Sequence, residues 1–157
     1  MFNFEVMNKA SRYERLHTQI FGLLQKCNDR QARMATVCAV LHHKMPYFFW
    51  TGFYLLNNDR LIVSTYQGPV SCMELIKNQG VCWTSIRSGK TIIVSDVHQF
   101  EGHIACDSRA KSEIVIPFYS NAGQIEGVLD VDSETLNSFD EIDAEWLEKI
   151  TSLIINI

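Results

Sequence analysis

Three of the five cysteines could carry thiol chemistry, because they fall outside the apolar spacing of a helix. Cys72 lies in an irregular stretch, Cys82 begins a predicted short helix, and Cys106 precedes polar residues that favour another helix start. The partial positive charge at a helix start lowers the pKa of a thiol, so Cys82 and Cys106 are predicted to form thiolates.

Three carboxylates fall on one face of a predicted pair of strands that follows the last of these cysteines. In segment 112–120 Glu113 alternates with apolar residues, and in segment 125–133 Asp130 and Asp132 share a side, because side chains alternate along a strand. Clustered carboxylates repel one another, so one of them is expected to keep its proton to a higher pH than usual.

A protonated carboxyl beside a thiolate is suited to reducing a polarised S=O bond. The thiolate attacks the sulfur while the acid protonates the departing oxygen, which leaves a sulfenic acid on the cysteine. A second cysteine converts the sulfenic acid to a disulfide, and an external thiol reductant restores both thiols.

The same residues are also compatible with structural or metal-binding roles. The three cysteines could be half-buried loop thiols, or could bind zinc with His98 or His103 as the fourth ligand, although no CxxC or CxxH spacing is present. The carboxylates could form an exposed polar sheet face. Cys27 and Cys38 continue helical apolar stripes and are predicted to be buried core residues.

Apolar periodicity and turn residues predict the elements that position these side chains. Helices are predicted over residues 10–26, 29–45, 82–88 and from Ser138 onward. Strands are predicted over 47–56, 61–66, 91–94, 112–120 and 125–133, and residues 67–80 are predicted to be irregular.

Several helix ends carry recognisable caps. Asp29 is the expected N-cap of the second helix, and Gly89 the expected C-cap of the short one. Ser138 with Glu141 three residues later resembles a capping box at the start of the last helix.

The expected fold is α+β, in one domain over residues 1–157. Hairpin connections predict a mainly antiparallel central sheet, with the N- and C-terminal helices on one face and the cysteine-bearing loops on the other. A small ligand is expected between the sheet and those loops.

Length and composition limit the classes of function. With 157 residues, 46% hydrophobic and 20% charged, the chain can bury a core without metals or disulfides. The net charge of −4 disfavours nucleic acid as a partner, and no apolar run is long enough to span a membrane. The N-terminal residues do not resemble a signal peptide, so a cytoplasmic location is expected, where an odd number of cysteines does not indicate a disulfide scaffold.

From about residue 47 onward the chain closely resembles the free methionine-(R)-sulfoxide reductases, GAF-fold enzymes that reduce free rather than peptide-bound methionine sulfoxide. The resemblance rests on the segments WTGFYLL (50–56), QGPVSC (67–72), GVC (80–82), VSDVHQFEGHIACDSRAKSEIVIP (94–117) and GVLDVDS (127–133). The combination of HIACDS, SEIV and LDVDS is highly specific among GAF domains.

The resemblance implies a role for each of the three cysteines. Cys106 matches the usual nucleophile, Cys72 the main resolving partner and Cys82 the third redox cysteine. The sequence departs from the family nearby, since Trp83 stands where glycine is usual and residues 73–79 lack the typical Arg-Ile-Pro pattern.

The same resemblance implies how substrate is held. Glu113, Asp130 and Asp132 match the residues that bind the sulfoxide and the substrate amine, while Trp50 and Tyr54 match the walls around the methyl thioether. No cofactor or metal is implied. A thioredoxin-type reductant is expected, and a homodimer through the terminal helices.

Two other functions remain open at this point. A non-catalytic GAF module that senses a small molecule or redox state is the main alternative to an enzyme. A dimerisation or scaffold protein is a further alternative, but it leaves the carboxylates and cysteines without a role.

Overall fold

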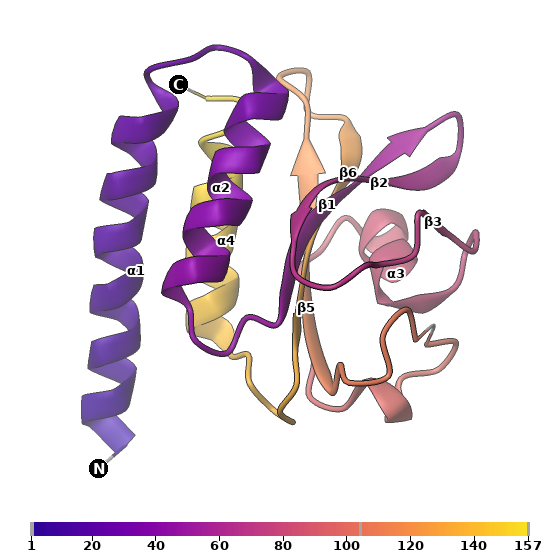
Figure 1. The fold of residues 1–157 in the computed structure, drawn as a ribbon. Coiled ribbons are helices and arrows are strands. Elements are labelled where there is room, and N and C mark those ends of the chain that lie inside the picture. The colour runs from indigo at the N-terminus through magenta and orange to yellow at the C-terminus, as the bar shows by residue number, and fades with distance from the viewer. Residues whose placement is uncertain (1, 104, 157) are drawn as a thin grey trace.

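A computed structural model describes residues 2–103 and 105–156, and Figure 1 shows a central sheet with helices on both sides. Within these residues the sheet has six antiparallel strands in the order β3-β2-β1-β6-β5-β4. The strands are β1 (Trp50–Asn57), β2 (Arg60–Gln67), β3 (Glu74–Leu75), β4 (Ile92–Val94), β5 (Ser112–Tyr119) and β6 (Ile125–Ser133).

The helices divide between the two faces of the sheet. In Figure 1, α2 and α4 lie on one face with α1 outside them, while α3 and the long loops lie on the other. The helices are α1 (Phe2–Leu24), α2 (Arg30–Lys44), α3 (Gly80–Ser88) and α4 (Glu141–Ser152), with a short 3-10 helix, η1 (Val97–Gln99). None of the helices in the described ranges is long and apolar enough to cross a bilayer.

Each face of the sheet has its own hydrophobic core, because alternate residues of a strand point to opposite sides. Ile114 and Ile116 of β5 pack with Leu129 of β6 under the helices α1, α2 and α4. Val115 and Val128 pack on the other side with residues of α3. The predicted alternation in β5 and β6 is therefore confirmed.

The predicted elements are present, with differences at their ends. Asp29 caps α2 by accepting a hydrogen bond from the Ala32 backbone N–H, as expected. Gly89 ends α3 in the left-handed conformation, at φ 64°, again as expected. However, α1 begins at Phe2, well before the predicted start, and α3 begins at Gly80.

The predicted cap of α4 is wrong. Asp140, not Ser138, is the N-cap, and its carboxylate accepts hydrogen bonds from the backbone N–H groups of Ile142 and Asp143. Asp143 completes the capping box by accepting from the Asp140 N–H. The Ser138 hydroxyl instead donates to Ser133 Oγ, in the loop that follows β6. A carboxylate therefore forms the cap, and the hydroxyl closes the preceding loop.

Two further expectations fail for local reasons. The segment 67–80 is not wholly irregular, because the two residues of β3 pair with Leu61 and Ile62 of β2. Cys27 is exposed rather than buried, because α1 ends at Leu24 and the apolar stripe does not continue into the connection. Cys38, inside α2, is buried as predicted.

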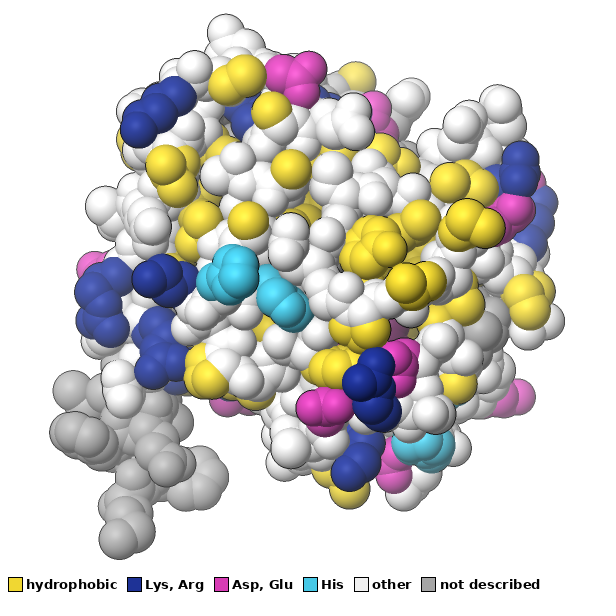
Figure 2. Space-filling view, viewed as in Figure 1, with side chains coloured by type: hydrophobic (Ala, Val, Ile, Leu, Met, Phe, Trp, Pro, Cys, Tyr) yellow, Lys and Arg dark blue, Asp and Glu magenta, His cyan; other side chains and the backbone are white. Residues whose placement is uncertain are grey.

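Charge is distributed over the surface in small groups. In Figure 2, lysine and arginine side chains form short clusters with acidic side chains near several of them. On the described part of the face shown, they do not merge into one continuous basic surface.

Candidate active site

The sheet brings the three predicted carboxylates to one pocket. Glu113 of β5 is the cross-strand partner of Asp132 of β6, and Asp130 lies two residues earlier on the same side. All three line a cavity of about 50 Å³ between the sheet, α3 and the loops. Glu113 and Asp130 are only 6% and 7% exposed, so the alternative of an exposed polar face is wrong.

Burial and mutual repulsion hold protons on this cluster. Burial, followed by the charges of Asp130 and Asp132, raises the pKa of Glu113 well above its ordinary value. Burial, Asp130 and Asp107 do the same for the pKa of Asp132. Burial raises the pKa of Asp130 to about 6. The expectation that a carboxyl here keeps its proton to a higher pH is confirmed.

Cys82 lies in the first turn of α3 and faces the carboxylates. Its thiol donates toward Glu113 Oε1 over 4.0 Å, and the residue is 4% exposed. Burial raises the pKa of Cys82 well above its ordinary value, and Asp130 and Glu113 raise it further. The prediction of a thiolate at this helix start is therefore wrong, because desolvation and nearby negative charge outweigh the helix dipole.

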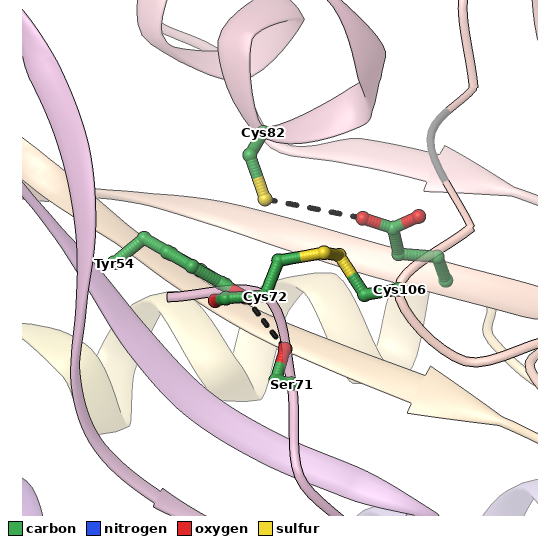
Figure 3. Close-up of a disulfide and its surroundings, with 6 residues drawn as sticks. Tyr54, Ser71, Cys72, Cys82 and Cys106 are labelled. Atoms are coloured by element: carbon green, nitrogen blue, oxygen red, sulfur yellow. Dashed lines mark hydrogen bonds between the residues drawn. A yellow bond between two sulfur atoms is a disulfide. The ribbon is translucent and has the colours of Figure 1, made fainter. Parts of the chain in front are cut away.

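Cys72 and Cys106 are joined by a disulfide at the mouth of the same pocket. Their Cα atoms are 5.3 Å apart although 34 positions separate them in the chain. Figure 3 shows the disulfide below Cys82, between the loop that precedes β3 and the loop that precedes β5. Cys106 is followed by a bend and a turn rather than by the helix that the sequence predicted.

The zinc site considered from the sequence does not fit this disulfide form. That site needed thiolates from all three cysteines, and two of them are bonded to each other. His103 lines the pocket, but its proposed alternative His98 is not among the lining residues and is largely exposed.

Tyr54 connects the sheet to the disulfide loop. Its hydroxyl donates to the Cys72 carbonyl oxygen over 2.9 Å and lies 2.6 Å from Ser71 Oγ. Figure 3 shows Tyr54 reaching from β1 toward this loop. The tyrosine that the resemblance marks as a substrate wall therefore also holds the loop that carries Cys72.

Trp50 lies behind Tyr54 rather than on the pocket surface. Its ring stacks on Tyr54 and Tyr66, with centroids 5.7 and 5.3 Å apart, and it is not among the residues that line the pocket. Gly52 makes this stack possible, because a Cβ at that position would lie 2.5 Å from the Trp50 ring. Trp50 thus supports the tyrosine wall in this disulfide form.

Trp83, the departure from the family pattern, does not enter the pocket. It is 3% exposed and packs in the core between α3 and the sheet, with Val94 and Val97 among its neighbours in that cluster. It therefore fixes α3 to the sheet and, through α3, the position of Cys82.

Sequence reasoning missed three polar residues that line the pocket. They are Ser71, Gln79 and Asp107. Arg109 donates two side-chain hydrogen bonds to Asp107, which lower the pKa of that carboxyl to about 2. Ser71 directly precedes Cys72 and Asp107 directly follows Cys106, and this adjacency was the signal from which their place in the pocket could have been predicted.

The pocket is small in this form. Its volume of about 50 Å³ holds only one or two water molecules, at about 30 Å³ each. A larger groove of about 830 Å³ lies on the helix side, between α4 and the outer strands, but no cysteine lines it. An amino acid can therefore enter the carboxylate pocket only if the disulfide-bearing loops move.

Comparison with known proteins agrees with this fold. A GAF domain family model matches residues 27–156, and the chain belongs to the GAF domain family. Within that family it is similar to the free methionine-R-sulfoxide reductase of Escherichia coli, with 35% identity over 93% of this chain and 88% of the relative. GAF domain-containing protein A of Dictyostelium discoideum is 49% identical over 95% of this chain and 94% of the relative.

A solved structure gives the same result. The X-ray structure of free methionine-R-sulfoxide reductase from Neisseria meningitidis, in complex with its substrate, is similar with a TM-score of 0.89. It is 38% identical, and the match covers 93% of this chain and 87% of that one. The fold and the family expected from the sequence are confirmed.

Proposed function

We propose that this protein reduces free L-methionine (R)-sulfoxide to L-methionine. The observation that carries the proposal is a disulfide, Cys72–Cys106, at the mouth of a pocket whose buried carboxyl groups retain protons. A thiol pair supplies the two electrons, and a protonated carboxyl supplies the acid that sulfoxide reduction requires. The similarity to the Escherichia coli and Neisseria meningitidis reductases supports this substrate.

The reduction begins from the dithiol form. The Cys106 thiolate attacks the sulfoxide sulfur, and Glu113 gives its proton to the oxygen, with Asp132 opposite it across the strands. This attack forms a bond between the Cys106 sulfur and the substrate sulfur, after which the S–O bond breaks and hydroxide leaves. The hydroxide then bonds to the Cys106 sulfur as the bond between the two sulfurs breaks, which releases methionine and leaves Cys106 as a sulfenic acid. The Cys72 thiol then attacks the sulfenic sulfur, and the oxygen departs as water while the disulfide forms.

Binding of the substrate uses the remaining polar and aromatic groups. Burial raises the pKa of Asp130 only to about 6, so this carboxyl is ionised at neutral pH. It is suited to pair with the substrate ammonium group. Tyr54, supported by Trp50, is assigned to the wall around the methyl thioether.

Cys82 is assigned a different role from the other two cysteines. Its thiol is buried and its raised pKa keeps it protonated, so it is a poor nucleophile in this form. It donates toward Glu113 and thereby helps to hold the carboxyl that supplies the proton.

Resetting the disulfide needs an external dithiol, for which a thioredoxin-type protein in the cytoplasm is the proposed partner. A homodimer through α1 and α4 is also proposed, on the basis of the family resemblance.

The direct test is turnover on separated epimers. Incubation with dithiothreitol and free methionine (R)-sulfoxide should yield methionine, while the (S) epimer, N-acetylated (R)-sulfoxide and the Cys106→Ser variant should yield little. Folded protein that binds the sulfoxide but forms no methionine from either epimer would support the sensing alternative instead.

A further inference from the structure

Three side chains bring one sulfur and two carboxylate groups to a single point under α3. Cys82, Glu113 and Asp130 each offer an atom, and these atoms all lie within 4.8 Å of one another. The three residues belong to α3, β5 and β6, so the arrangement is held by three packed elements rather than by one loop. All three are more than nine-tenths buried.

One of these groups lacks a partner. Asp130 Oδ1 is buried and has no hydrogen-bond partner among residues 2–103 and 105–156. A buried carboxylate oxygen without a partner is costly. The described residues that line the pocket include Asp107 and Asp132 but neither lysine nor arginine, so a bound cation would be the fitting partner for this oxygen.

We propose that Cys82, Glu113 and Asp130 form a binding site for Zn²⁺. One sulfur and two carboxylate oxygens suit this borderline-soft ion, which also keeps a water in a fourth position in many three-ligand sites. Magnesium and calcium are disfavoured because they require more oxygen ligands and do not favour sulfur. The cavity of about 50 Å³ has room for an ion and a water.

Little movement is needed to complete the site. Ligand bonds to zinc are about 2.0–2.3 Å, so neighbouring ligand atoms around the ion lie roughly 3–4 Å apart. Cys82 Sγ and Glu113 Oε1 already lie 4.0 Å apart. On coordination Cys82 loses its thiol proton to solvent, as thiol ligands of zinc do.

This site does not use the Cys72–Cys106 pair, so it is available while that disulfide is closed. The ion would occupy the place that the proposed function assigns to the substrate ammonium and to the acid. We therefore expect zinc to inhibit turnover, and this expectation rests on the proposed function. The expectation that zinc binds does not.

Co²⁺ is the probe for the test, because a thiolate ligand gives it a charge-transfer band in the near ultraviolet. The protein is prepared with the Cys72–Cys106 disulfide intact, so that Cys82 is the only thiol among the described pocket-lining residues that can bind metal. We expect the band to appear with Co²⁺ and to disappear when Zn²⁺ displaces it.

Matched variants locate the site. Cys82→Ser should abolish the band, and Asp130→Asn should weaken Zn²⁺ binding in calorimetry by at least about a hundredfold, since even outer-shell changes cost about 10–100-fold. Cys27→Ser, which removes an exposed thiol, should leave the Co²⁺ band and the Zn²⁺ affinity unchanged. Thermal melting checks folding, and Glu113→Gln replaces Cys82→Ser as the deciding variant if the latter does not fold.

Two results would overturn the proposal: no thiolate band in folded protein, or a band that survives Cys82→Ser. Unchanged Zn²⁺ affinity in Asp130→Asn would also contradict it. Because these readouts need no turnover, an inactive protein that still binds the metal would count against the proposed function alone.

Discussion

Glu113 of β5 and Asp132 of β6 stand directly opposite each other in the antiparallel sheet, on the face that α3 covers. Like charges at such a position are destabilising, so the pair favours a state in which at least one carboxyl is protonated. In the proposed function, this pair supplies the acid that protonates the sulfoxide oxygen.

Removing that acid should lower the rate without unfolding the protein. Glu113→Gln and Asp132→Asn keep the shape of each side chain, and at least one should lower methionine formation by about a hundred- to ten-thousand-fold. The melting temperature should be unchanged or higher, because one of the repelling groups is gone. Single-turnover methionine release measured beside a thermal melt separates the two effects. Near-normal release from both variants would mean that water or another group supplies the proton.

Stability should depend on pH through Asp130. Its pKa is raised from 3.8 to about 6 on folding, so the folded state holds the proton more tightly than the unfolded state. Its contribution to the free energy of unfolding is therefore fully present below about pH 4 and is lost as the pH rises through about 6. Relative to Asp130→Asn, the natural protein should lose stability over this window. Chemical denaturation of both proteins at a series of pH values, in EDTA to exclude metals, measures this difference. If the free energies of unfolding of the two proteins changed in parallel with pH, the raised pKa of Asp130 would be contradicted.

The free thiols should differ strongly in reactivity. Cys27 is exposed, whereas Cys82 is buried and its pKa is raised by burial and by the carboxylates. With the Cys72–Cys106 disulfide closed, iodoacetamide at neutral pH should label Cys27 faster than Cys82 by about tenfold or more. Peptide mapping over time gives both rates. Equal labelling would show that Cys82 is accessible and ionised, in conflict with its assigned role.

The contact between α1 and α4 depends on a buried carboxylate. Asp143 is fully buried and accepts hydrogen bonds from the hydroxyls of Tyr13 and Tyr47 and from the Asp140 N–H, while Lys9 forms an ion pair with it. Asp143→Asn turns an amide N–H₂ toward other donors and should cost about 2–4 kcal/mol, or about 5–15 °C in melting temperature.

Glu145→Gln on the exposed side of α4 is the control for this change, and its effect should stay within about 0.5 kcal/mol. Similar melting temperatures for the two variants would mean that Asp143 is not the residue that holds α1 and α4 together. The folded fraction of Asp143→Asn should remain active, because the residue does not line the carboxylate pocket.

The sequence predicted the sheet and the carboxylate face because those features depend on alternation alone. Once Glu113 and Asp132 are placed on adjacent strands, a period of two residues decides which side they take. Helix ends were harder to predict, because several polar side chains near each end compete to cap it. At the start of α4 the cap is Asp140 rather than the predicted Ser138.

The ionisation state of the thiols could not be read from the sequence. A cysteine at a helix start predicts a low pKa, but the pKa of Cys82 is raised because strands remote in sequence bring carboxylates against it and exclude water. Ser71 and Asp107 adjoin Cys72 and Cys106 in the sequence, but whether they line the pocket depends on loops that only the fold brings there.

A single turnover without reductant tests the proposed chemistry most directly. Fully reduced protein, freed of small thiols, is mixed with excess free methionine (R)-sulfoxide, and methionine and disulfides are quantified in the same sample. About one methionine per chain should form, together with a Cys72–Cys106 linkage and an unlinked Cys82. Methionine formation that leaves Cys106 free, or its absence in folded protein whose thiols are reduced, would contradict the assignment of Cys106 as the nucleophile of a methionine sulfoxide reductase.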